Sequence, residues 1–320
     1  MNQRPFGKLG RVSALTLGGG GLGQLWGPTT REECVATARE AVELGITLLD
    51  MAPSYGNGEA ESVIGEAFAG RLPTGVRITT KCRVGETPPA DIPRLLEDSL
   101  TASLARMRLD RVDIFFLHNW VVPDGAPSHD RGTPRSVVEQ AVIPTFERLV
   151  AQGRIGAWGL TGIGEPGALI SLLDAHRPKP DYIQIIANLL DSPGGLKYPD
   201  TPARPRDIMA AAKRAGTVIM GIRAVQAGAL TSALDRSKPA DNPETLDHSR
   251  AAPFRAIAAE IGCSPAFLAH QYALSLDGPS TIVLGVKNRA ELRECVEAEA
   301  AGPMDPALVE RIDQAVGRPD

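Results

Sequence analysis

The sequence has few cysteines, few aromatic residues and no long hydrophobic run. Its four cysteines, Cys34, Cys82, Cys263 and Cys295, lie far apart and form no CxxC pair, so neither a disulfide framework nor a zinc site is indicated. No apolar run approaches the roughly 20 residues of a membrane-spanning helix, and the opening MNQRPFGKLG lacks the apolar core of a signal peptide. We therefore expect a cytoplasmic protein without membrane contact.

A large excess of one charge is also missing. Lys and Arg total 34 and Asp and Glu total 38, giving a net charge of −4 without a basic block. Nothing therefore indicates a nucleic-acid partner. The 43% hydrophobic and 22% charged content is typical of a globular protein with a normal core. A length of 320 residues suits one (β/α)₈ barrel, so we expect a single domain over residues 1–320.

Short apolar segments alternate with amphipathic helices along the whole chain. The segments that read as strands are 14–17, 46–49, 77–81, 112–117, 155–160, 182–187, 218–222 and 280–284. Residues 136–152 and a segment beginning at Arg289 read as helices, and residues 119–134 read as a long loop. Strands that are apolar on both faces and separated by helices are typical of a parallel sheet covered by helices. Eight such units favour closure of the sheet into a barrel over an open sheet. The sequence therefore predicts an α/β fold, a (β/α)₈ TIM barrel of parallel strands with its active site at the C-terminal mouth.

A run of glycines follows the first of these strands. Residues 18–23, GGGGLG, formally match the GxGxxG dinucleotide fingerprint. That motif should open a helix directly, but QLWGP comes next and the next helix is expected only after Thr30. We therefore expect a flexible loop in which the backbone approaches a ligand or a neighbouring strand.

Four ionisable side chains lie at or just past predicted C-terminal strand ends: Asp50, Tyr55, Lys81 and His118. Each has a simple structural explanation by itself, as a loop cap, a half-buried aromatic ring, a solvated charge or a core histidine. Three successive strands nevertheless deliver polar groups to one rim. In a barrel these strand ends meet at one mouth, where active sites are built.

These groups suit proton transfer to a carbonyl oxygen. Tyrosine, with a reference pKa of about 10, is a poor acid at neutral pH. A cation such as Lys81 would lower the pKa of Tyr55, Asp50 would hold that cation, and His118 would orient the oxygen. No nucleophile elbow and no metal cluster are visible, so we expect no metal and a bound cofactor as the source of reducing power. A barrel lyase or isomerase without nicotinamide is the alternative, and it would need a metal or phosphate site.

From about Phe6 to Cys295 the chain resembles the aldo-keto reductase superfamily. The segments that carry the resemblance are FGKLGRVSALTLGGGGLG, LLDMAPSYGNGEAESVIGEAF, ITTKC, VDIFFLHN and STIVLGVKNRAELREC. The resemblance implies a barrel that binds NADP(H) across its mouth and passes hydride between nicotinamide and a carbonyl carbon. Tyr55 would be the general acid in reduction or the base in alcohol oxidation, assisted by Lys81, Asp50 and His118.

The resemblance also implies a set of cofactor contacts. In the family, a Ser and a Gln hold the carboxamide of nicotinamide. Thr161 replaces that Ser, and Gln184 matches that Gln. Ile222 stands where the family has a Tyr that stacks on the nicotinamide ring. The remaining candidates are Gly20, Gly21, Asp50, Arg223 for the pyrophosphate, Gly285, Lys287, Asn288 and Glu294. Lys287 would favour NADP, but the charge of Glu291 would oppose a 2′-phosphate, so NAD(H) stays open as the alternative cofactor.

The sequence defines the substrate less closely than it defines the fold and the cofactor. Besides Tyr55 and His118, the mouth loops carry Trp26 and Trp120, which would either line an apolar pocket wall or anchor their loops. The expected partner is a small carbonyl compound, or the matching alcohol or sugar, and a homo-oligomer is compatible with the sequence. A cofactor-binding regulatory or redox-sensing subunit, resembling channel β-subunits, is the second functional interpretation.

Overall fold

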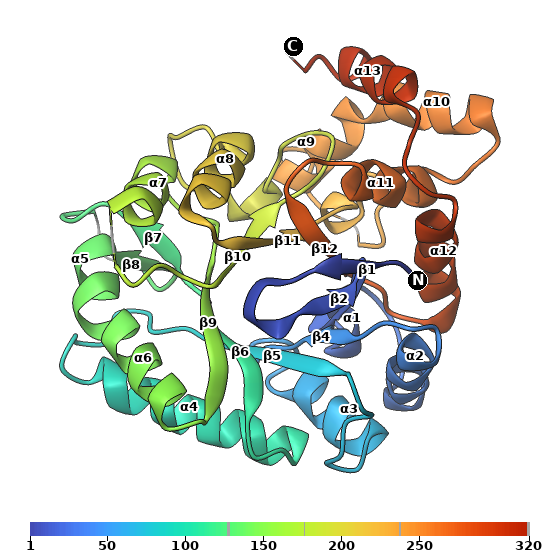
Figure 1. The fold of residues 1–320 in the computed structure, drawn as a ribbon. Helices are drawn as coiled ribbons and strands as arrows, with labels where there is room; N and C mark the ends of the chain where they lie inside the picture. The colour runs from blue at the N-terminus through green and yellow to red at the C-terminus, as the bar shows by residue number, and fades with distance from the viewer. Residues whose placement is uncertain (127–128, 176, 237, 319–320) are drawn as a thin grey trace.

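Eight parallel strands close into a barrel at the centre of the molecule (Figure 1). The computed structural model describes residues 1–126, 129–175, 177–236 and 238–318, and residues 319–320 of the expected domain lie outside that range. Around the barrel the strands are β3 (Leu15–Gly18), β4 (Leu48–Asp50), β5 (Arg77–Cys82), β6 (Val112–Leu117), β9 (Ile155–Thr161), β10 (Tyr182–Ile186), β11 (Val218–Ile222) and β12 (Pro279–Leu284). The predicted (β/α)₈ barrel is confirmed.

Helices surround the barrel and bury their apolar faces against it. They are α2 (Arg31–Glu43), α3 (Glu59–Ala67), α4 (Ile92–Met107), α6 (Ile143–Ala151), α7 (Pro166–Ala175), α8 (Pro205–Ala215), α11 (Pro265–Leu274) and α12 (Arg289–Ala300). Local sequence fixes several starts, because the Thr30, Ser264 and Asn288 side chains accept hydrogen bonds from backbone N–H groups of the first turn. Outside this ring lie α9 (Pro243–Arg250), α10 (Ala252–Ile261) and α13 (Pro306–Ala315).

A hairpin closes the N-terminal end of the barrel. Strands β1 (Gln3–Pro5) and β2 (Arg11–Ser13) pair antiparallel. The Tyr182 hydroxyl, at the start of β10, donates a 2.9 Å hydrogen bond to the Phe6 carbonyl oxygen. Phe6 and Tyr182 are buried in a cluster that fills this end of the barrel. The opposite, C-terminal end is therefore left for a binding site.

The glycine run differs from the expected flexible loop. Gly19–Leu22 forms a short helix, α1. A Cβ at Gly21 would lie 1.7 Å from the Val286 carbonyl oxygen, and a Cβ at Gly18 would lie 2.2 Å from the Leu284 carbonyl oxygen. These glycines are required because two backbone segments pack directly against each other. The predicted approach of this backbone to a neighbouring strand is therefore correct, whereas the predicted flexible loop is not.

Two further local features differ from the sequence-based expectation. The long loop after His118 contains two three-residue strands, β7 (Trp120–Val122) and β8 (Gly132–Pro134), which pair in parallel. The expected helix 136–152 is divided into α5 (Arg135–Val137), a π-helical turn over Val138–Val142, and α6. Pro144 accounts for that wide turn, because its ring has no N–H and would crowd the carbonyl four residues earlier.

Candidate active site

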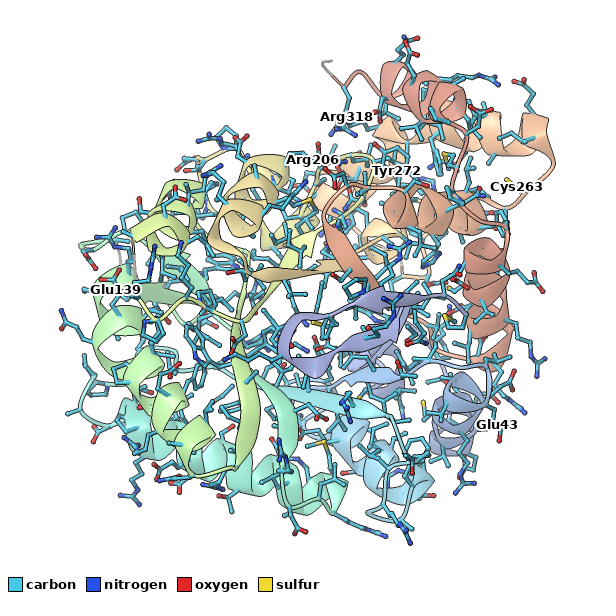
Figure 2. All side chains as sticks on the ribbon, viewed as in Figure 1. Glu43, Glu139, Arg206, Cys263, Tyr272 and Arg318 are labelled. Atoms are coloured by element: carbon cyan, nitrogen blue, oxygen red, sulfur yellow. The ribbon has the colours of Figure 1, made fainter. Side chains whose placement is uncertain are left out.

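The four predicted ionisable side chains come together at the C-terminal mouth. Asp50 ends β4, Tyr55 lies in the loop that follows, Lys81 is in β5 and His118 follows β6. Strands β4, β5 and β6 are successive neighbours in the barrel. Side chains fill the space inside the ring of strands (Figure 2). The site is therefore built within a packed core.

Lys81 and Asp50 form a fully buried ion pair. The Lys81 ammonium donates to Asp50 Oδ2 at 2.8 Å and to the Met51 carbonyl oxygen at 2.8 Å. Asp50 Oδ1 accepts from the Thr79 hydroxyl at 2.6 Å and from the Gln184 amide at 2.8 Å. Burial disfavours the charged amine, but Asp50 and Tyr55 together outweigh burial, and the pKa of Lys81 is raised. The site thus holds a fixed ammonium.

Tyr55 and His118 face this ammonium and each other. The Lys81 nitrogen lies 4.9 Å from the centroid of the Tyr55 ring. The Tyr55 and His118 rings meet edge to face, with centroids 5.8 Å apart and planes at 88°. Nδ1 of His118 lies 3.4 Å from the Ser54 hydroxyl oxygen. A group bound at the mouth would therefore meet the phenol and the imidazole together.

The electrostatics of these two rings keep both of them neutral. Burial raises the pKa of Tyr55, and the charge of Lys81 lowers it by less than burial raises it. This corrects the expectation that Lys81 lowers the Tyr55 pKa below its ordinary value. Burial also lowers the pKa of His118 well below its ordinary value, with Lys81 and Arg83 adding to the effect. Tyr55 is consequently a protonated phenol and His118 a neutral imidazole at neutral pH.

Thr161 and Gln184 end up buried beside the tetrad of Asp50, Tyr55, Lys81 and His118. The Thr161 hydroxyl donates to the Leu117 carbonyl oxygen at 2.9 Å, and the Gln184 amide nitrogen donates to Asp50. Arg223 lies just past β11 in a left-handed conformation, with φ of 61°. Its guanidinium donates to Gln226 at 2.7 Å and lies 3.4 Å from Glu244. The charge predicted for pyrophosphate is therefore paired with a carboxylate in this structure.

The predicted adenosine-phosphate segment lies between β12 and α12. The Lys287 ammonium is 3.3 Å from Asp235 and also pairs with Glu291. Asn288 caps α12 by accepting a 2.9 Å hydrogen bond from the Glu291 N–H. Glu294 accepts a hydrogen bond from the Ser264 hydroxyl. Asn288 and Glu294 thus have structural partners that the sequence did not indicate.

The two mouth tryptophans occupy opposite sides of the site. Trp26 is half-buried against Gly20 and Gly285, and the Arg236 guanidinium lies 5.2 Å from its ring centroid. Trp120 stacks on His129, with centroids 5.1 Å apart, and meets Tyr198 in a T-shaped arrangement with centroids 6.0 Å apart. Trp120 also belongs to an apolar cluster against which Ile222 packs. An aromatic and aliphatic wall is therefore present on the side of β11.

Sequence reasoning missed the residues that hold Asp50 and Lys81 in place. Thr79 was detectable, because it precedes Lys81 by two positions on one strand and so shares its face. The Met51 carbonyl and the Gln184–Asp50 bond had no local signal. In the parts of the chain that the structure describes, no group of His, Cys, Asp or Glu suits a metal ion. Within those same parts, every helix is too short or too polar to span a membrane.

Fold and site together define a parallel (β/α)₈ barrel with proton-transfer groups at its C-terminal mouth. The model of the aldo/keto reductase family matches residues 14–316, and the chain therefore belongs to the aldo/keto reductase family. The resemblance noted in the sequence is confirmed.

Individual relatives cover nearly the whole chain. L-galactose dehydrogenase of Arabidopsis thaliana is 28% identical over 299 residues, covering 92% of this chain and 87% of that protein. A putative voltage-gated potassium channel subunit beta of Schizosaccharomyces pombe is 27% identical over 345 residues, covering 97% and 92%. An aldo-keto reductase from Klebsiella pneumoniae in complex with NADPH superposes with a TM-score of 0.72 at 19% identity, covering 100% and 97%. At this level of identity, the similarity to the Klebsiella pneumoniae protein shows a shared fold only.

Proposed function

We propose that this protein is an NADP(H)-dependent oxidoreductase that reduces an aldehyde or ketone, or oxidises the matching alcohol or sugar. The observation that carries the proposal is the buried Lys81–Asp50 pair beside Tyr55, with His118 facing the same ring. Membership of the aldo/keto reductase family supports it. So do the Arabidopsis thaliana dehydrogenase and the NADPH-bound Klebsiella pneumoniae protein.

The donor set at the mouth fits a nicotinamide dinucleotide phosphate. Thr161 and Gln184 are buried next to the tetrad and offer a hydroxyl and an amide to a carboxamide. Lys287, beside the N-terminus of α12, offers a cation to a phosphate. When bound, the cofactor supplies the hydride.

The chain's own residues supply the proton and the orientation. In reduction, the neutral phenol of Tyr55 donates its proton to the carbonyl oxygen. The phenolate that results lies near the fixed ammonium of Lys81, which makes the charged form less costly at the moment it appears. Neutral His118 donates a ring N–H to the same oxygen, and Asp50 keeps Lys81 charged and in place.

The direct test is Tyr55→Phe, which removes the proton donor and keeps the ring. We expect kcat to fall by about 10²–10⁴-fold while NADPH affinity is kept. Steady-state rates and titration of NADPH fluorescence measure the two quantities. Tyr198→Phe is the matched control, because Tyr198 lies at the same mouth and contacts Trp120 through its ring. Near-normal turnover of Tyr55→Phe would remove Tyr55 from the proposed role.

The choice between NADP(H) and NAD(H) depends on Lys287. Lys287 pairs with Asp235 and Glu291, so a 2′-phosphate would have to compete with these two carboxylates for the ammonium. This competition supports some use of NAD(H). Titrating the protein with NADPH and with NADH gives the two affinities. Absence of binding by either would favour a barrel enzyme of another class.

A cofactor-binding regulatory or redox-sensing subunit is the second candidate. The 27% identity to the Schizosaccharomyces pombe channel subunit, over nearly all of both chains, favours keeping it. A panel of aldehydes, ketones and sugars assayed with NADPH separates the two functions. A sensor would bind the cofactor and turn over no member of the panel above background.

A further inference from the structure

Arg83 lies one residue past the C-terminal end of β5, at the position that continues the inward-facing row of that strand. Side chains alternate along this strand: Thr79 and Lys81 bond Asp50 inside, whereas Thr80 bonds Glu61 of α3 outside. Continued alternation directs Arg83 to the same side as Lys81, about 7 Å closer to the mouth. Arg83 is therefore the next inward-facing residue above the Lys81 ammonium.

The backbone on both sides of Arg83 is tied to the residues next to His118. The Cys82 carbonyl accepts a 2.7 Å hydrogen bond from the His118 N–H. The Val84 N–H donates to Asn119 Oδ1 at 2.9 Å, and the same side chain donates to the Asp130 carbonyl at 3.3 Å. These bonds hold the backbone of Arg83 beside His118, so the imidazole lies within reach of the long Arg83 side chain.

Among the residues that the structure describes, no carboxylate forms an ion pair with Arg83. Its side chain is exposed, and in the ranges that the structure describes it has no ion pair and no hydrogen bond. The cations predicted to meet the cofactor are different, because Lys287 pairs with Asp235 and Arg223 with Glu244. Arg83 acts on the reacting groups, since its charge adds to the lowering of the His118 pKa and opposes the raised pKa of Tyr55.

We propose that Arg83 binds an anionic group of the substrate, so that the protein prefers aldehydes or ketones that carry a carboxylate or a phosphate. The carbonyl oxygen would lie at Tyr55 and His118, and the anionic end would reach the guanidinium about 7 Å farther out. Asp50 neutralises Lys81 only, so a bound anion would supply the missing counter-charge. A guanidinium is suited to this because its planar N–H groups bind a carboxylate or phosphate in pairs. This inference rests on the proposed function.

The kinetic test compares substrates that differ in charge and little else. We would assay succinic semialdehyde against butanal, 4-carboxybenzaldehyde against 4-methylbenzaldehyde, and glyceraldehyde 3-phosphate against glyceraldehyde, all with NADPH. Arg83→Gln should lower kcat/KM by about 10–100-fold for the charged members, the range of a charge-assisted hydrogen bond, and change the neutral members little. Arg83→Lys should restore part of the loss. Arg71→Gln, with the same charge change at an exposed position in the loop before β5, is the control.

A binding measurement separates this inference from the proposed function. Calorimetric titration of the NADPH-loaded protein with succinate, with inorganic phosphate and with neutral succinamide needs no turnover. We expect the wild type to bind one or both anions more tightly than succinamide, and Arg83→Gln to weaken anion binding at least about tenfold. The stronger anion identifies the group that the substrate carries. Equal binding by wild type and Arg83→Gln, or equal losses for charged and neutral substrates, would overturn the role of Arg83. Turnover of no aldehyde alongside Arg83-dependent anion binding would instead overturn the proposed function.

Discussion

At the scale of single residues, the Lys81–Asp50 pair keeps a positive charge fixed inside the barrel. Removing one partner leaves the other ion buried without a counter-charge, whereas removing both charges leaves a neutral site. We expect Lys81→Met to lower the free energy of unfolding by about 3–5 kcal/mol. The double variant Lys81→Met with Asp50→Asn should cost less than the single one. Urea denaturation measures both, and a double variant less stable than Lys81→Met would contradict the argument.

The pKa directions of Tyr55 and His118 predict the pH dependence of reduction. The acid form of Tyr55 is present below its pKa, which burial raises, so the proton donor is kept through neutral pH. His118 stays neutral down to a pH well below 6.5 because its pKa is strongly lowered. The pH profile of kcat/KM should therefore be flat between about pH 6.5 and 9, since ordinary His and Tyr values lie near 6.5 and 10. A break near pH 6.5 that disappears in His118→Gln would show that the imidazole titrates.

At the scale of elements, Gly21 and Gly285, both predicted at the cofactor site, differ in how strictly the structure requires glycine. A Cβ at Gly21 in α1 would strike the Val286 carbonyl, whereas a Cβ at Gly285 would meet only the Trp26 ring at 3.5 Å. We expect Gly21→Ala to destabilise the fold by about 1–3 kcal/mol, because α1 must move away from the segment that follows β12. Gly285→Ala should fold as the wild type does. Thermal unfolding of the two variants compares them directly, and equal melting temperatures would contradict this explanation.

Element positions follow closely from the sequence where the pattern is long and local. The predicted strand 112–117 coincides with β6, and the predicted helices after Thr30 and Arg289 coincide with α2 and α12. Among the misses are the three-residue strands β7 and β8 and the π-helical turn before Pro144. Three residues are too few to show a period, and a wide turn depends on how one proline is accommodated within a helix.

At the scale of the whole molecule, the segment after β11 reaches across to the side of β12 and α1. Asp235 pairs with Lys287, and Arg236 lies over Trp26. This places a carboxylate on the lysine predicted to bind the 2′-phosphate. We expect Asp235→Asn to tighten NADPH binding by up to about fivefold and to change NADH binding little, since an exposed pair of this kind is weak.

Fluorescence titration with each cofactor measures this preference. Asp277→Asn is the control, because Asp277 pairs with Lys213 in an exposed bridge on α8, away from Lys287. Equal changes in NADPH and NADH affinity would show that Asp235 does not act through the 2′-phosphate.

The sequence by itself determined the alternation of strands and helices and the strand ends that carry Asp50, Lys81 and His118. These features depend on hydrophobic periodicity and turn residues, which act within a few positions. Closure into a barrel then brings Asp50, Lys81 and His118 to one mouth.

Only the tertiary structure decided which partner each charged group finds. Asp50 receives Gln184 from 134 residues away, and Lys287 receives Asp235 from 52 residues away. Burial of the Tyr55 ring reversed the expected direction of its pKa. That Arg83 has no ion-pair partner among the described residues became visible only in space. Desolvation and ion pairing depend on what surrounds an atom in three dimensions, and a linear pattern does not contain that information.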